Sequence, residues 1–249
     1  MAISVARALN IENQEKGIVF LLLAQSIFLG IFAGSLDVGA NALFLDAYNA
    51  DMMPRAFMIS GAVGIIFTSF YTFLQKRIPF HLFTVLNLLI ALLFTGLLRL
   101  GYQLYDDPRL AFAVLVMMGP IIIITMLGFW GTAGRYFSLR EGKRLFGIID
   151  TGSVLGMILA FYAVPILMNF SFKTIDTLLI GLISLVVALF LQAIVLRRYK
   201  LVTVAPVGHQ ERKRSGIFSL FGRKYTTLMA VFVMMSVVAG FFIQFHVGN

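Results

Sequence analysis

The chain has 249 residues, of which 60% are hydrophobic and 12% charged. A soluble domain carries about twice that fraction of charged residues, so the composition excludes an ordinary water-soluble fold and favours helices solvated by lipid. The absence of cysteine excludes disulfides and thiolate metal sites, and the net charge of +9 indicates membrane orientation rather than nucleic-acid binding, because no basic soluble domain with interleaved aromatic residues is present.

Seven apolar stretches follow one another along the chain, each close to or above the roughly 20 residues that a helix needs to cross a bilayer. They are Gly17–Leu36, Ala56–Gln75, Leu82–Leu98, Leu110–Gly134, Leu145–Phe172, Thr177–Leu196 and Tyr225–Val247. Backbone groups in lipid must be satisfied within their own segment, and these stretches do not alternate as barrel strands do. The sequence therefore predicts an all-α membrane protein that contacts the lipid bilayer.

The segments between the stretches alternate in charge. If the N-terminus is cytoplasmic, the segments 1–16, 76–81, 135–144 and 197–224 lie inside and hold 16 of the 20 Lys and Arg residues. The outer segments hold the other four, together with the acidic residues Asp37, Asp46, Asp51, Asp106, Asp107 and Asp176. By the positive-inside rule we predict a cytoplasmic N-terminus, in a bacterial inner membrane.

Four regions are expected in chain order. Residues 1–16 are a cytoplasmic segment that forms either a short interfacial helix or a frayed terminus, and 17–196 are a six-helix bundle. Residues 197–224 are a basic cytoplasmic linker, and 225–249 hold a seventh helix. This is the layout of a six-plus-six transporter, so we expect a fragment that lacks most of its C-terminal half or further domains.

No catalytic or metal-binding pattern stands out. There is no nucleophile–base pair, no ligand cluster and no phosphate-binding glycine loop, and the three histidines lie in different segments. We therefore predict that the chain is not an enzyme and binds neither a metal nor a cofactor.

Asp150 lies inside the fifth stretch, where a carboxylate is costly and usually functional. It is either a substrate- or proton-coupling group, or a partner for Arg135, Arg140 or Arg144 near the cytoplasmic side. In both cases we expect its side chain to point inward rather than toward lipid.

Asp37 and Asn41 follow the first stretch and are four residues apart, so they share a face if the helix continues. They then line the outer mouth of a substrate path, and otherwise they belong to a solvated loop. Gly30 with Gly34, and Gly152 with Gly156, form GxxxG pairs that predict close helix packing within the chain.

The most specific motif runs from residue 130 to 156, WGTAGRYFSLREGKRLFGIIDTGSVLG. It resembles the ATP/ADP translocase (nucleotide transporter) family of bacteria and plastids, which is related to the major facilitator fold. In that family a tryptophan ends the fourth helix and a Glu-Ala-Lys-Arg-Phe-like motif opens the fifth. The matching residues here are Trp130, Glu141, Lys143, Arg144 and Phe146.

The resemblance implies the six-helix N-terminal half of a major-facilitator-like bundle that moves a small solute, such as a nucleotide, by alternating access. Trp130 then lines the central cavity, and a charge cluster acts either as a gate or in topology and head-group contact: Arg135, Arg140, Glu141, Lys143 and Arg144. One departure is that family members keep basic residues in the first span, whereas the matching region here, Gly34–Tyr48, has Asp37 and no Lys or Arg to meet a polyanion. The alternatives are a diverged member with another substrate, or a non-transporting membrane module that anchors or regulates cytoplasmic domains.

Overall fold

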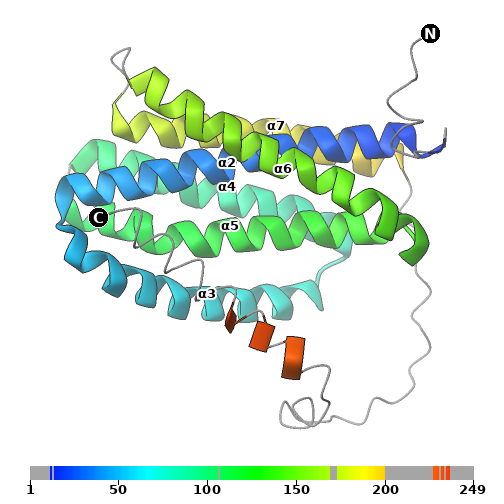
Figure 1. Ribbon diagram of the computed structural model, residues 1–249, viewed down its shortest axis with the longest axis horizontal. Coiled ribbons are helices and arrows are strands. Elements are labelled where there is room, and N and C mark those ends of the chain that lie inside the picture. The colour runs from blue at the N-terminus through cyan, green and yellow to red at the C-terminus, as the bar shows by residue number, and fades with distance from the viewer. Residues whose placement is uncertain are drawn as a thin grey trace. The chain divides into compact units, whose positions relative to one another are not determined.

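The computed structural model describes residues 12, 14–105, 107–168 and 173–199 in one compact unit, and residues 227–229, 231–232 and 234–235 in a second. The first unit is a bundle of six helices (Figure 1). They are α2 (Lys16–Ala47), α3 (Met53–Gln75), α4 (Phe80–Tyr105), α5 (Pro108–Tyr136), α6 (Leu139–Met168) and α7 (Thr177–Arg198). Short 3₁₀ turns, Ala50–Met52 and Thr174–Asp176, precede α3 and α7.

These six helices confirm the first six predicted spans, and all are long and apolar enough to cross a membrane. No strand occurs among the described residues, so the described part of the protein is all-α. The predicted seventh span is described only at 227–229, 231–232 and 234–235, which are helical. The predicted interfacial segment, up to residue 11, and residues 200–224 of the predicted linker lie outside the described residues.

The helix ends follow local sequence signals. Asp107 caps α5 because its carboxylate accepts a hydrogen bond of 2.8 Å from the backbone N–H of Arg109, and Pro108 occupies the first helical position. At the start of α6, Ser138 and Glu141 form a capping box, in which each side chain bonds to the other residue's backbone N–H.

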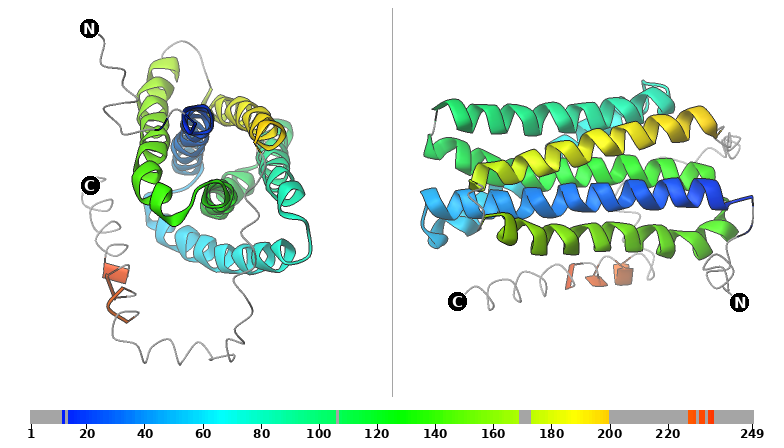
Figure 2. Two further views of the ribbon diagram at one scale, coloured as in Figure 1. Left: turned by 90° about the vertical axis from the view of Figure 1, so that its right-hand side faces the viewer. Right: turned by 90° about the horizontal axis from the view of Figure 1, so that it is seen from above.

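Viewed along the helix axes, α2 and α5 take the middle of the bundle (Figure 2). Helix α6 packs on α2, α3 packs on α5, and α7 and α4 lie together on one side of the α2–α5 pair. In the most apolar part of α2 56% of the residues are buried, compared with 11% for α3. Helix α2 is therefore the core of the bundle, and α3 is its most peripheral helix.

The two predicted GxxxG pairs pack against each other at the α2–α6 contact. A side chain at Gly30 would collide with the backbone of Ser153, and one at Gly156 would collide with the backbone of Ile27. Ser26 adds a hydrogen bond of 2.7 Å from its hydroxyl to the carbonyl oxygen of Ile149. The glycines let the two backbones approach closely, as expected from the sequence.

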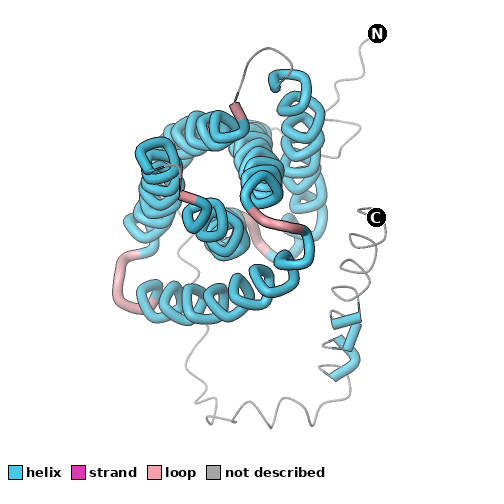
Figure 3. The backbone as a smooth tube through the Cα atoms, turned by 90° about the vertical axis from the view of Figure 1, so that its left-hand side faces the viewer, coloured by secondary structure: helices cyan, strands magenta, loops and turns pink. Residues whose placement is uncertain are grey.

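The packing has an exchange symmetry between the first three helices and the last three. The close contacts are α2 with α6, α7 and α5, α5 with α3 and α4, and α4 with α7. Exchanging α2, α3 and α4 for α5, α6 and α7 leaves this set unchanged. Because equivalent helices are three places apart in the chain, they cross the bundle in opposite directions. Figure 3 shows the loops that join the helices at the ends of the bundle.

Candidate functional site

Asp37 and Asn41 lie inside α2, not in a loop after it, because the helix continues to Ala47. Both side chains are half-buried. The amide nitrogen of Asn41 donates to the carboxylate of Asp37 at 3.0 Å and to its backbone carbonyl at 2.9 Å. Among the described residues no other hydrogen bond or ion pair reaches this carboxylate. The shared face predicted for these two residues is therefore confirmed, and the loop alternative is wrong.

The position of Asp37 follows from its helical neighbours. It lies seven residues before Phe44, whose ring is 6.0 Å from that of Phe112 on α5. It also lies three residues after Gly34, which faces Met157 of α6. With 3.6 residues per turn, the carboxylate projects from the side of α2 that lies between α5 and α6. It is ten residues from the end of α2, or about 15 Å along the helix.

Asp150 does not turn into the bundle. Its side chain is exposed, and its carboxylate accepts a hydrogen bond of 3.1 Å from the hydroxyl of Ser153 on the same helix. No ion pair joins it to Arg135, Arg140 or Arg144 in the part of the chain that the structure describes. The prediction of an inward-pointing carboxylate is therefore wrong for this bundle, because the buried face of α6 is taken by the glycines that contact α2.

The structure does not bring Asp37 and Asp150 together. The hydrogen bond between Ser26 and the carbonyl of Ile149 places Asp150 at the level of Ser26. Eleven residues of α2, or about 17 Å along its axis, separate Ser26 from Asp37. Two carboxylates so far apart do not act on one bound group, and Asp37 with Asn41 is the better candidate site.

Trp130 belongs to an aromatic cluster between α5 and α6. Its ring is 5.7 Å from that of Phe146 and 5.3 Å from that of Phe129, both in edge-on geometry. Phe137 extends the cluster, with its ring 6.2 Å from that of Phe146. The structure thus joins two residues of the motif, Trp130 and Phe146, in a packing contact that holds the α5–α6 turn.

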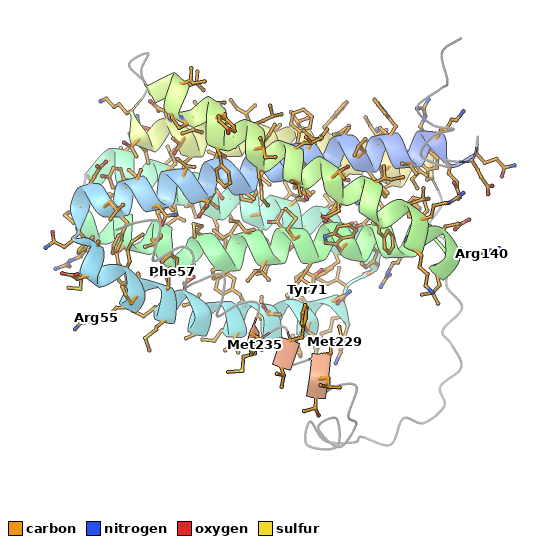
Figure 4. The ribbon with its side chains drawn as sticks, in the orientation of Figure 1. Arg55, Phe57, Tyr71, Arg140, Met229 and Met235 are labelled. Atoms are coloured by element: carbon orange, nitrogen blue, oxygen red, sulfur yellow. The ribbon has the colours of Figure 1, made fainter. Side chains whose placement is uncertain are left out.

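The predicted charge cluster divides into separate contacts at one end of the bundle, which we call the basic end because it holds Lys76, Arg77, Arg135, Arg140 and Arg144. Figure 4 shows Arg140 at this end and Arg55 at the other. Glu141 serves as a helix cap. Arg140 and Lys143 are exposed, and neither forms an ion pair with a described residue.

Arg144 is the member of the cluster that connects distant parts of the chain. One guanidinium nitrogen lies 2.6 Å from each carboxylate oxygen of Glu15, the residue before α2, and another lies 3.6 Å from a carboxylate oxygen of Glu12. Arg135 instead stacks on Phe80, with its guanidinium carbon 3.4 Å from the ring centre. Arg144 therefore fixes the start of α2 to the start of α6.

Sequence reasoning missed a buried polar chain through the bundle. The side-chain amide of Gln25 on α2 donates to the amide oxygen of Gln192 on α7 at 2.8 Å, and Gln192 donates to the hydroxyl of Thr84 on α4 at 3.4 Å. All three side chains are almost fully buried. The available signal was an uncharged polar residue inside each apolar stretch, which a search for ionisable groups passes over.

Within the described residues, no three His, Asp or Glu side chains gather in a way that could hold a metal ion. Comparison with protein-family models, with curated proteins and with solved structures gives no match for this chain. The resemblance to the ATP/ADP translocase family therefore stays a prediction based on the residues from Trp130 to Phe146. The structure supports the broader class, a membrane protein with six apolar helices.

Proposed function

We propose that this bundle is one half of a secondary transporter, which moves a small solute across the membrane by alternating access. The exchange symmetry of the helix packing carries this proposal. Triplets of helices that run in opposite directions are the inverted repeats from which many secondary transporters are built, and their substrate sites lie where the repeats meet. A nucleotide or related metabolite is the solute that the sequence resemblance implies.

Asp37 and Asn41 are the residues that we assign to this function. A carboxylate well inside a membrane helix is costly unless it meets a cation, a proton or a polar solute. Asn41 holds one carboxylate oxygen of Asp37, which leaves the other to a ligand. A negative group at this position opposes a polyanion, so it favours a solute that is cationic, or one whose movement is coupled to a cation or proton.

Transport is tested with the full-length protein in liposomes. A heat-stability screen against nucleotides, amino acids and cations first identifies a solute that raises Tm, and uptake of that solute is then measured. We expect Asp37→Asn to reduce uptake at least tenfold and to remove the rise in Tm. Asp51→Asn changes an exposed carboxylate in the 3₁₀ turn before α3, and this matched control is expected to keep both the uptake and the rise in Tm. Unchanged uptake by Asp37→Asn would contradict the assignment.

The second candidate function is a membrane anchor for cytoplasmic domains. The observation in its favour is a filled interior: Leu22, Leu29, Phe32 and Leu36 of α2 have no exposed surface. A bundle that only anchors needs no open path through its centre. Failure of every solute to raise Tm or to enter the liposomes would favour this function.

A further inference from the structure

Helices α3 and α4 follow each other in the chain but hardly touch, because α3 packs on α5 and α4 packs on both α5 and α7. They leave a groove with a volume of about 400 Å³ between them. Its walls are apolar, with Phe67, Phe70 and Leu74 on α3 and Phe83, Ile90 and Phe94 on α4. A groove of this kind in a membrane helix bundle accepts an aliphatic chain in preference to a polar solute.

The groove has the length of one lipid leaflet. Its α3 wall runs from Ile66 to Leu74 and its α4 wall from Phe83 to Phe94. At 1.5 Å per residue these walls are about 12 and 17 Å long, and half of the hydrocarbon core of a bilayer is about 15 Å thick. The walls come from the last part of α3 and the first half of α4, so the groove lies in the leaflet at the basic end.

Tyr71 supplies a polar group inside the groove. Only 8% of Tyr71 is exposed, and its ring packs edge-on against Phe83 at 4.7 Å. Its buried hydroxyl has no hydrogen-bond partner among the described residues, which is costly in an apolar setting. Tyr71 lies four residues, or about 6 Å, before the end of α3, so it is close to the basic end of the groove.

The mouth of the groove is positively charged. Lys76 and Arg77 occupy the turn between α3 and α4, and Arg135 lies against Phe80 at the start of α4. The Arg77 guanidinium stacks on Phe73, with 4.6 Å between its carbon and the ring centre. None of these three cations forms an ion pair with a carboxylate in the part of the chain that the structure describes, so their charge is open to an anion.

We propose that this groove binds an anionic phospholipid from the leaflet at the basic end. One acyl chain lies between α3 and α4, the Tyr71 hydroxyl donates a hydrogen bond to an ester carbonyl, and the phosphate is held by Lys76, Arg77 and Arg135. The apolar length, the unpartnered hydroxyl and the cations follow the order of chain, ester and phosphate in a phospholipid. The site is separate from Asp37 and does not depend on the proposed transport.

The test is native mass spectrometry of the full chain released from nanodiscs that contain phosphatidylglycerol and phosphatidylcholine in equal amounts. We expect one phosphatidylglycerol to remain bound. Ile90→Trp, which fills the groove, is expected to remove it, whereas Leu93→Trp, on the exposed side of the same helix, retains it. Arg77→Gln weakens retention about fivefold, since one surface cation contributes about 1 kcal/mol, and Arg55→Gln at the opposite end has no effect.

Tyr71→Phe keeps the packing of the ring and removes only the hydroxyl, so it tests the site even if Ile90→Trp does not fold. We expect it to lower phosphatidylglycerol retention while Tm stays within a few degrees of wild type. Equal retention of both lipids by the wild type would overturn the proposal. Unchanged retention of phosphatidylglycerol by Ile90→Trp would also overturn it. A wild-type dimer that becomes a monomer in Ile90→Trp would also overturn it, because a second copy of the chain would then fill the groove.

Discussion

Single glycines decide how closely α2 and α6 approach. An added side chain at Gly156 would meet the carbonyl oxygen of Ile27 and the backbone nitrogen of Ile31, neither of which can move aside without shifting the helix. We expect Gly156→Ala to lower the free energy of unfolding by about 1–3 kcal/mol, as overpacking does in a close-packed interior. Denaturant unfolding of the purified protein in micelles measures the change.

Gly147 is the matched control, because it lies on the same helix with no neighbouring atom where a side chain would be added. Gly147→Ala is expected to be neutral or to stabilise by about 0.5–1 kcal/mol through higher helix propensity. Equal effects of the two substitutions would show that the α2–α6 contact does not depend on these glycines.

The sequence correctly predicted that Asp37 and Asn41 share one face of a helix. It wrongly predicted that the side chain of Asp150 points into the interior of the bundle. Spacing along a helix fixes which residues share a side, so the four-residue separation was sufficient for the first pair. Which side of α6 is buried depends on its partner. Gly152 and Gly156 turn that side toward α2 and leave Asp150 exposed, and the position of α2 is a tertiary fact that the local sequence does not contain.

At the scale of elements, the ion pair between Arg144 and Glu15 connects the starts of α6 and α2. Both side chains are mostly buried, so water screens the pair less than it screens an exposed one. We expect a coupling energy of about 1 kcal/mol from a double-mutant cycle with Arg144→Gln and Glu15→Gln, at the upper end of the range for surface pairs. Unfolding of the four proteins at low salt measures it.

Arg140→Gln is the control for this cycle, because Arg140 is exposed and forms no ion pair with a described residue. Its effect is expected to stay within about 0.5 kcal/mol, as for most surface substitutions. Additive effects of Arg144→Gln and Glu15→Gln would mean that the two groups do not stabilise the start of α2 through each other.

The apolar stretches predicted six helices well because length and hydrophobicity determine what spans a bilayer. The end of α2 was the main error. A prediction from apolar runs stops at Leu36, before Asp37, but the helix continues for eleven residues to Ala47. Packing against α5 and α7 stabilises these last residues of α2 as a helix, since Phe44 contacts Phe112 and Gly39 lies against Thr177.

At the scale of the molecule, orientation can be tested by cysteine labelling, because the chain contains no cysteine of its own. Single cysteines at Asp51 and Lys143, both exposed, lie at opposite ends of the bundle. We expect Asp51→Cys to react with an impermeant maleimide in intact cells and Lys143→Cys to react only after the membrane is opened. The reverse pattern would refute a cytoplasmic N-terminus.

The exchange symmetry of the bundle was not visible in the sequence. The sequence shows no clear repeat between the two triplets, and what they share is the choice of helix partners. Contact partners are set by the shape of whole helix surfaces, which many different side chains can produce. The sequence therefore predicted the class, the first six spans and close packing at the GxxxG pairs, and the arrangement of the helices required the structure.

The central place of α2 has a consequence for how the protein is made. Its partners α6 and α7 are completed about 120 and 150 residues later, which at 5–20 residues per second is a delay of about 6–30 seconds. During this time Gln25 and Asp37 stand in lipid without the helices that later surround them. We therefore expect α2 to remain associated with the insertion machinery until its partner helices are synthesised. If translation stops before α6, α2 lacks these partners, and we expect the truncated chain to be degraded.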